Sequence, residues 1–248
     1  MQALNDHIGK DGFRLRGTAM SRVDGFSDVV FGFALTLIVV SLEVPHTYDE
    51  LHTALLGFLP FFLCFVTLIG IWWDHFSFFR RYGLHDEGTI FINCTLLFTV
   101  LFYVYPLKFL FTVIATPSSG PTAPHVFSNA LQIRELMILY GVGFAAIYLC
   151  LSALDWNAWR QRASLGLSLL ERTLTLTYLW DHMGFVITGM LCCLAARLLP
   201  PAKAAHATWA IFFMAIWKTL HRYISRRYIR AAQANLASED SSTLSEPG

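Results

Sequence analysis

Long apolar runs alternate with short polar segments along this chain. Most runs approach the length of roughly 20 residues that a helix needs to cross about 30 Å of hydrocarbon. The pattern therefore predicts an all-α membrane protein with six transmembrane helices per subunit. The predicted spans are residues 22–45, 55–73, 90–115, 136–154, 174–194 and 204–220, of which the last is the shortest.

Local signals refine the ends and interior of these spans. Ser21 is the predicted N-cap of the first helix, and Asp24 three residues later favours the positive end of the helix dipole. The HTYDE segment after that helix predicts a short acidic loop. Pro60 predicts a kink in the second span, and Pro106 with Lys108 predicts a kink and a snorkelling cation in the third.

The composition agrees with a polytopic membrane protein. The 248 residues are 55% hydrophobic and 14% charged. A net charge of +1 argues against nucleic-acid binding, which needs a basic face. The cysteines lie inside apolar spans and are interpreted as buried small side chains, so we expect neither a metal site nor a bound cofactor. The chain has no HExxH or GxSxG motif, which argues against an enzyme.

The distribution of lysine and arginine predicts the orientation. With six spans, fourteen basic residues fall on the side of both termini and four on the other. Basic loops stay inside, so both termini are predicted to be cytoplasmic in a multi-pass protein of the cell's inner membrane. Residues 1–20 are a predicted cytoplasmic arm, 21–230 the six-helix domain and 231–248 a disordered tail. Three acids are predicted at the outer mouth of the first helix: Glu43, Asp49 and Glu50.

Asp28 is an ionisable residue inside the first span, and an unpaired charge at that depth costs a few kcal/mol. Arg22 lies six positions away on the same helix, which is not an i+3 or i+4 spacing. Asp28 is therefore expected to find its partner on another helix. Trp72 and His75, at the end of the second span, lie at the predicted depth of Asp28.

Arg22, Phe26, Ser27 and Asp28 form the pattern R-x-x-x-F-S-D, and Trp72 with His75 forms W-x-x-H. These motifs and the six-span layout resemble the transmembrane-protein-175 family of potassium channels. The resemblance implies a homotetramer in membrane lipid, in which the first helix of each subunit lines the pore. It also implies that the six motif residues lock helix packing on the cytoplasmic side. The permeant ion would be K+, with other monovalent cations as further candidates.

The pore-lining stripe that the resemblance implies is Phe33, Thr36, Leu37 and Val40, whose i, i+3, i+4, i+7 spacing places them on one helical face. Apolar rings of this kind gate by dewetting. The chain has no TVGYG-like filter, so selectivity must arise differently from that of filter-bearing potassium channels. Without the resemblance, ordinary helix packing or lipid contact would explain the same stripe.

Two other interpretations stay open at this stage. Asp28 or His75 could bind a proton, which would make gating sensitive to pH. A proton-coupled secondary transporter would use acids and histidines inside the spans, and the tripeptide Trp-Asp-His occurs at residues 73–75 and again at 180–182. An inverted repeat would place equivalent positions on opposite sides of the membrane, whereas these tripeptides share a side, so the recurrence is interpreted as coincidence.

Overall fold

A computed structural model describes most of the chain between residues 8 and 229. The described residues are 8–9, 11–40, 46–56, 58–115, 127–210, 212–214, 216–221, 223, 225 and 229. Within them the chain is helical and contains no strand. The helices are α2 (Arg22–Val40), α3 (Tyr48–Leu56), α4 (Phe58–Tyr82), α5 (Glu87–Ala115), α6 (Ala130–Arg160), α7 (Leu169–Leu198) and the 3-10 helix η1 (Pro201–Trp209).

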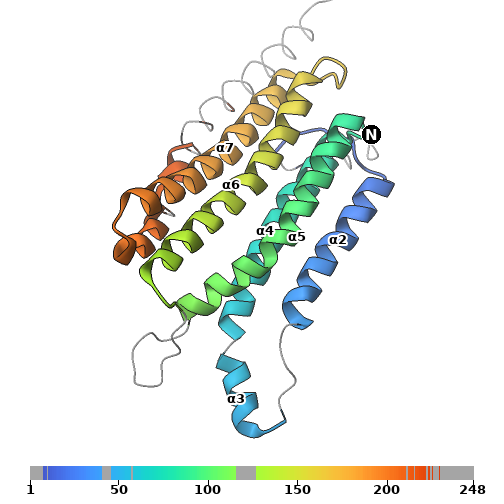
Figure 1. The fold of residues 1–248 in the computed structure, drawn as a ribbon. Coiled ribbons are helices and arrows are strands. Elements are labelled where there is room, and N and C mark those ends of the chain that lie inside the picture. Colours follow the sequence, from blue (N-terminus) through green and yellow to red (C-terminus); the bar gives the residue numbers. More distant parts are fainter. Residues whose placement is uncertain are drawn as a thin grey trace, which may run out of the picture.

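The long helices form a bundle in which α5 and α4 lie between α2 on one side and the α6–α7 pair on the other (Figure 1). Among the described residues, four helices, α4 to α7, are long and apolar enough to cross a membrane. This confirms an all-helical, multi-pass membrane protein. Large apolar side chains such as Phe91, Phe98 and Phe102 point outward from α5, as expected for a surface that meets lipid or another subunit.

Two glycines bring the backbones of α6 and α7 close together. A Cβ atom at Gly141 would lie 2.7 Å from the Gly189 carbonyl oxygen, and one at Gly189 would lie 2.6 Å from the Gly141 carbonyl oxygen. The missing side chains therefore allow the two backbones to touch. Small residues serve this purpose in membrane helices, where the packing itself drives association.

Three local predictions change in the structure. The segment expected to be an acidic loop is instead largely helical, because Tyr48–Leu56 forms α3. Pro60 lies in the first turn of α4. Backbone N–H groups of the first turn make no hydrogen bond within the helix, so the proline breaks none and does not kink the helix interior. The kink at Pro106 stays a prediction, and this residue lies inside α5. The predicted sixth span begins as the 3-10 helix η1, and the described residues 210, 212–214 and 216–221 after it are helical.

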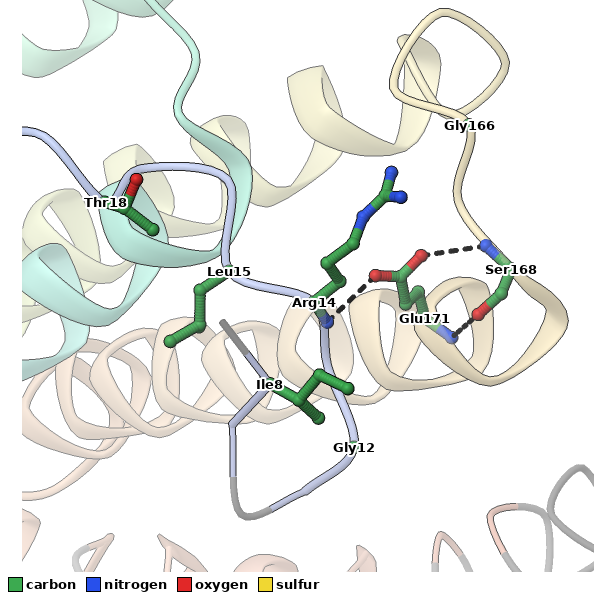
Figure 2. A pocket seen from close by; sticks show the side chains of 8 residues that line it. All are labelled: Ile8, Gly12, Arg14, Leu15, Thr18, Gly166, Ser168 and Glu171. Atoms are coloured by element: carbon green, nitrogen blue, oxygen red, sulfur yellow. Dashed lines mark hydrogen bonds between the residues drawn. The ribbon is translucent and has the colours of Figure 1, made fainter. Parts of the chain in front are cut away.

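The predicted arm, where described, packs against the ends of α4 and α7. The Arg16 guanidinium donates to both carboxylate oxygens of Glu171, each at 2.9 Å, and Phe13 is buried edge-on against Tyr82. Glu171 also belongs to a capping box with Ser168 at the start of α7. Figure 2 shows this carboxylate between the backbone N–H groups of Arg14 and Ser168, beside a cavity of about 440 Å³. The predicted tail, 231–248, lies outside the described residues.

Candidate functional site

The α2 helix has two distinct faces. Ser27, Phe31, Ala34 and Ile38 repeat at helical spacing and are buried against the rest of the bundle. The opposite face is uncovered: Phe33 is 57% exposed, and Val29 and Thr36 are exposed beside it. The α2 helix therefore has two apolar faces: one packs against the bundle and the other is uncovered.

Two residues of the predicted stripe lie on the open face. Phe33 and Thr36 are exposed, and the Thr36 hydroxyl donates to the Phe33 carbonyl oxygen at 2.7 Å. Leu37 is half-buried and packs against the core at the edge of this face. The side chain of Val40 lies outside the described part of the chain.

A buried hydrogen-bonded chain holds the inner face of α2 to α4 and α5. The Ser27 hydroxyl donates to the Val23 carbonyl oxygen at 2.8 Å, and the Asn93 amide donates to the Ser27 oxygen at 2.9 Å. His75 Nε2 lies 2.8 Å from the Asn93 amide oxygen. All three polar side chains are almost fully buried, so each hydrogen bond satisfies a group that water does not reach.

The directions of these bonds assign the tautomer of His75. Because Asn93 uses its NH2 group on Ser27, its oxygen accepts, and His75 Nε2 must carry the proton. His75 Nδ1 is buried and has no hydrogen-bond partner among the described residues, and aromatic rings of Phe31 and Phe79 flank the imidazole. A second proton at Nδ1 would have no acceptor there. The geometry favours a neutral imidazole in a packing role.

Asp28 takes its partner from α4. Trp72 Nε1 donates to Asp28 Oδ1 at 2.8 Å, and the Trp72 ring stacks on Phe76. A cleft of about 350 Å³ between α2 and α4 opens beside this contact. Of the six motif residues, Ser27 and His75 belong to the buried chain, and Asp28 and Trp72 form a second contact beside it. Arg22 and Phe26 are exposed.

Lys108 lies near the other end of α2, and one of the predicted outer acids is described. Asp49 is exposed on α3, while Glu43 and the Glu50 side chain lie outside the described residues. The Lys108 ammonium group lies 3.5 Å from the Ile38 carbonyl oxygen, in the last turn of α2. A cation there interacts favourably with the negative end of the helix dipole.

Sequence reasoning missed two features of the site. Asn93 is the link between Ser27 and His75, and its signal was an amide inside an apolar span. The second feature is a cluster of Asp74, Asp155 and His182, which brings residues from α4, α6 and α7 together. Each of these was visible as an ionisable residue within or at the end of a span, but the sequence did not indicate that they meet.

Comparisons with known proteins agree with this architecture. A family model described as the endosomal/lysosomal potassium channel TMEM175 matches residues 22–103, which include the α2 motif, Trp72, His75 and Asn93. A potassium channel from Marivirga tractuosa is 35% identical over 188 residues, 73% of this chain and 73% of the relative.

Solved structures give the same result. A crystal structure of a variant of the potassium channel MtTMEM175, in complex with a nanobody fusion protein, matches with a TM-score of 0.75 and 28% identity over 88% of this chain and 97% of that one. A homologue from Chamaesiphon minutus shares the fold, with a TM-score of 0.50 and 21% identity over 79% of this chain and 96% of that one. The family consists of channels, which confirms the expectation that the protein is not an enzyme. The chain belongs to the TMEM175 family of potassium channels.

Proposed function

We propose that four copies of this chain assemble in the inner membrane into a K+-permeable channel whose pore is lined by α2. The observation that carries the proposal is the open face of α2. A span that is packed on one side by a buried polar network and bare on the other, with Phe33 57% exposed, needs something to cover the bare side. A ring of four such faces around a shared axis would cover it.

The narrowest layer of that pore would be built from the Phe33 rings. Thr36, Leu37 and Val40 would follow along the pore towards its outer mouth. An apolar ring opposes ions by denying them hydration, so wetting of this layer would set the current. Thr36 supplies the hydroxyl of the stripe, and its oxygen can replace part of the ion's hydration shell. Glu43, Asp49 and Glu50 would raise the cation concentration at the outer mouth.

The network of Ser27, Asp28, Trp72, His75 and Asn93 would act as scaffold in this channel. It ties α2 to α4 and α5, so that the open face keeps a constant rotation about the helix axis. The neutral tautomer that the hydrogen bonds favour for His75 supports this role over proton binding at that residue.

The proposed topology has six spans per subunit and cytoplasmic termini. The helical residues after η1 support a sixth span. Arg80 and Arg81 at the end of α4 and Arg160 at the end of α6 lie at the end of the bundle where the arm packs, and this basic end would face the cytoplasm.

A planar bilayer with opposed K+ and Na+ gradients tests the function directly. Purified protein is expected to give a reversal potential close to that of K+. No current, or saturable uptake linked to protons instead of a channel current, would overturn the proposal and favour a transporter. The Phe33→Trp variant, purified in parallel, is expected to block the pore and is the control for currents from contaminating channels.

A further inference from the structure

A cavity of about 440 Å³ lies where the arm meets the start of α7 (Figure 2). The arm contributes Ile8, Arg14 and Thr18 to its lining, and the start of α7 contributes Ser168 and Glu171. None of these residues belongs to the predicted pore stripe or to the polar network that holds α2. The cavity is therefore a feature of the molecule that the proposed pore does not use.

Glu171 is the only acid among the residues that line this cavity, and its charge is already neutralised. Both of its carboxylate oxygens accept from the Arg16 guanidinium at 2.9 Å. The backbone N–H groups of Arg14 and Ser168 donate to the same carboxylate at 3.0 and 2.9 Å. The Glu171 side chain is 5% exposed, so it has neither the free charge nor the access to bind a cation.

The groups left free in the cavity are hydrogen-bond donors. Arg14 is exposed, and its guanidinium makes no hydrogen bond or ion pair within the described part of the chain. The Ser168 oxygen accepts from the Glu171 N–H at 3.3 Å, which leaves the Ser168 O–H to donate, and Thr18 supplies a second hydroxyl group. With Glu171 neutralised by Arg16, the lining keeps one positive charge. A guanidinium fork together with hydroxyl donors suits the oxygens of a phosphate group.

Exposed arginines outnumber exposed acids at this end of the bundle, among the residues that the structure describes. Besides Arg14, the exposed arginines on the neighbouring helix ends are Arg80, Arg160 and Arg172, with Arg162 on the loop before α7. The exposed acids are Asp86 and Glu87, at the start of α5. Such a field concentrates anions near the cavity, which supports an anionic ligand.

The cavity lies at the level where α7 would enter the membrane. Glu171 belongs to the first turn of α7, a helix long and apolar enough to span a bilayer. Two apolar side chains at this level are uncovered: Leu169 at the start of α7 is 50% exposed, and Ile8 in the cavity lining is 51% exposed. A free arginine beside exposed apolar side chains fits an amphiphile whose phosphate group lies at the membrane surface and whose chains lie in the bilayer.

A ligand in this cavity would touch the segment that leads into α2. The arm is already held against α4, because the Gly17 N–H donates to the Arg80 carbonyl oxygen at 3.1 Å. A Cβ atom at Gly17 would collide with the Phe79 carbonyl oxygen, so the two backbones lie in close contact. The chain enters α2 at Arg22, shortly after Thr18. A ligand that joins the arm to α7 therefore adds a second anchor to the approach of α2.

We propose that this cavity binds a phosphate group through Arg14 and the hydroxyl groups of Thr18 and Ser168, and that the ligand in the membrane is the headgroup of an anionic phospholipid. The bound phosphate joins the arm to the start of α7 and stabilises the arm in its docked position. The site does not depend on whether the chain conducts K+, so its tests use stability and hydrogen exchange instead of current.

Binding is measured by thermal unfolding of delipidated protein in detergent, with added phosphatidylglycerol or with phosphatidylcholine of the same chains. Phosphatidylglycerol is expected to raise the unfolding temperature of the wild type more than phosphatidylcholine does. Arg14→Gln removes the charged contact and keeps the backbone N–H that donates to Glu171, so this variant should fold. It is expected to bind phosphatidylglycerol about tenfold more weakly, as for the loss of a hydrogen bond to a charged group.

Arg160→Gln is the matched control, because it makes the same change of charge at an exposed position outside the cavity lining. It is expected to bind phosphatidylglycerol as the wild type does. Equal weakening in the two variants, or no weakening in Arg14→Gln, overturns the site, since the lipid would then respond only to the overall charge of the surface.

Hydrogen exchange locates the ligand and distinguishes its source. Phosphatidylglycerol is expected to slow the exchange of backbone amides in residues 11–18 and 166–171 of the wild type, and not in Arg14→Gln. Protection elsewhere with none in these segments overturns the site. Sodium phosphate, compared with sodium chloride at equal ionic strength, is expected to have little effect. Protection by phosphate equal to that given by phosphatidylglycerol overturns the lipid headgroup as the ligand and assigns the cavity to free phosphate.

Discussion

At the scale of single residues, the position of α2 depends on a few hydrogen bonds that cross between helices. The Trp72 indole donates to an ionised acceptor, and such bonds are stronger than those between neutral groups. Asn93 is placed between two buried partners and satisfies both at once. The loss of Asn93 leaves buried polar atoms without water, which costs more than the bond itself contributes.

Trp72→Phe removes the indole N–H and keeps an aromatic ring beside Phe76. We expect a loss of about 1.5–3 kcal/mol, since the bond is to a charged group. Thermal unfolding in detergent measures the change. Trp73→Phe is the matched control, because its ring is 58% exposed and should tolerate the change. Equal stability of the two variants would show that the Asp28 contact does not hold α2.

Asn93→Ala leaves both Ser27 and His75 without this partner. We expect a loss of about 1–3 kcal/mol for each group left unsatisfied, with partial relief if water enters. Asn93→Asp loses the donor for Ser27 and places a carboxyl group where water does not reach, so it should not recover the lost stability. Thr95→Ala on the exposed side of α5 serves as control in the same unfolding assay. An Asn93→Ala variant as stable as Thr95→Ala would show that Asn93 does not hold Ser27 and His75.

At the scale of the helix, the two faces of α2 predict opposite consequences for the same substitution. Phe31 is 3% exposed and contributes to the core, whereas Phe33 is 57% exposed on the open face. Both are phenylalanines of one helix, two positions apart. They therefore separate packing from a role in the pore without a change in chemistry.

Phe31→Ala should cost about 3–5 kcal/mol through the cavity it leaves. Phe33→Ala should change subunit stability by about 0.5 kcal/mol or less, as for other surface positions, and should raise the current and weaken the preference for K+. Single-channel recordings and thermal unfolding are made on the same preparations. Unchanged unitary conductance in Phe33→Ala, together with lower stability, would remove Phe33 from the pore.

The turn between α4 and α5 shows how a loop residue joins two helices. Partial burial raises the pKa of Asp86, but hydrogen bonds from Thr89, Gln161 and Asn157 outweigh this effect and lower the pKa to about 2. Gln161 lies just after α6 and Asn157 lies in its last turn, so this carboxylate ties the start of α5 to the end of α6.

Because the pKa of Asp86 is depressed in the folded state, its contribution to stability is present above its ordinary pKa of 3.8 and is lost as the pH falls towards about 2. Asp86→Asn should lower the unfolding temperature at neutral pH, and the difference from wild type should shrink between pH 4 and pH 2. Glu87→Gln, an exposed neighbour in the first turn of α5, is the control. A difference that stays constant over this range would mean that the charge of Asp86 contributes nothing.

At the scale of the whole molecule, a single chain leaves apolar faces of α2 and α5 uncovered. Lipid can cover such faces as well as protein can, so the exposure of these side chains does not by itself give the number of subunits. We predict a homotetramer, because one α2 cannot enclose a pore and the resemblance to the family implies four subunits, which closed cyclic symmetry would place around one axis. Native mass spectrometry from nanodiscs measures the assembly, and a stable monomer that still conducts K+ would contradict the pore proposed here.

The sequence by itself determined the helical membrane class, the approximate spans and the resemblance carried by Arg22, Phe26, Ser27 and Asp28. These features depend on the length of apolar runs and on local spacing, which the order of residues contains directly. The capping of α2 by Ser21 and Asp24 is of the same local kind, with reciprocal bonds of 3.0 and 3.1 Å.

Only the tertiary structure decided which polar groups meet. Asp28 and Trp72 are 44 positions apart, Ser27 and Asn93 are 66 apart, and His182 contacts acids on two other helices. The rotation of each helix about its own axis determines these contacts, and that rotation is set by packing against all its neighbours at once. The same rotation buries Phe31 and exposes Phe33, because positions two apart on a helix are separated by about 200° and lie on opposite faces.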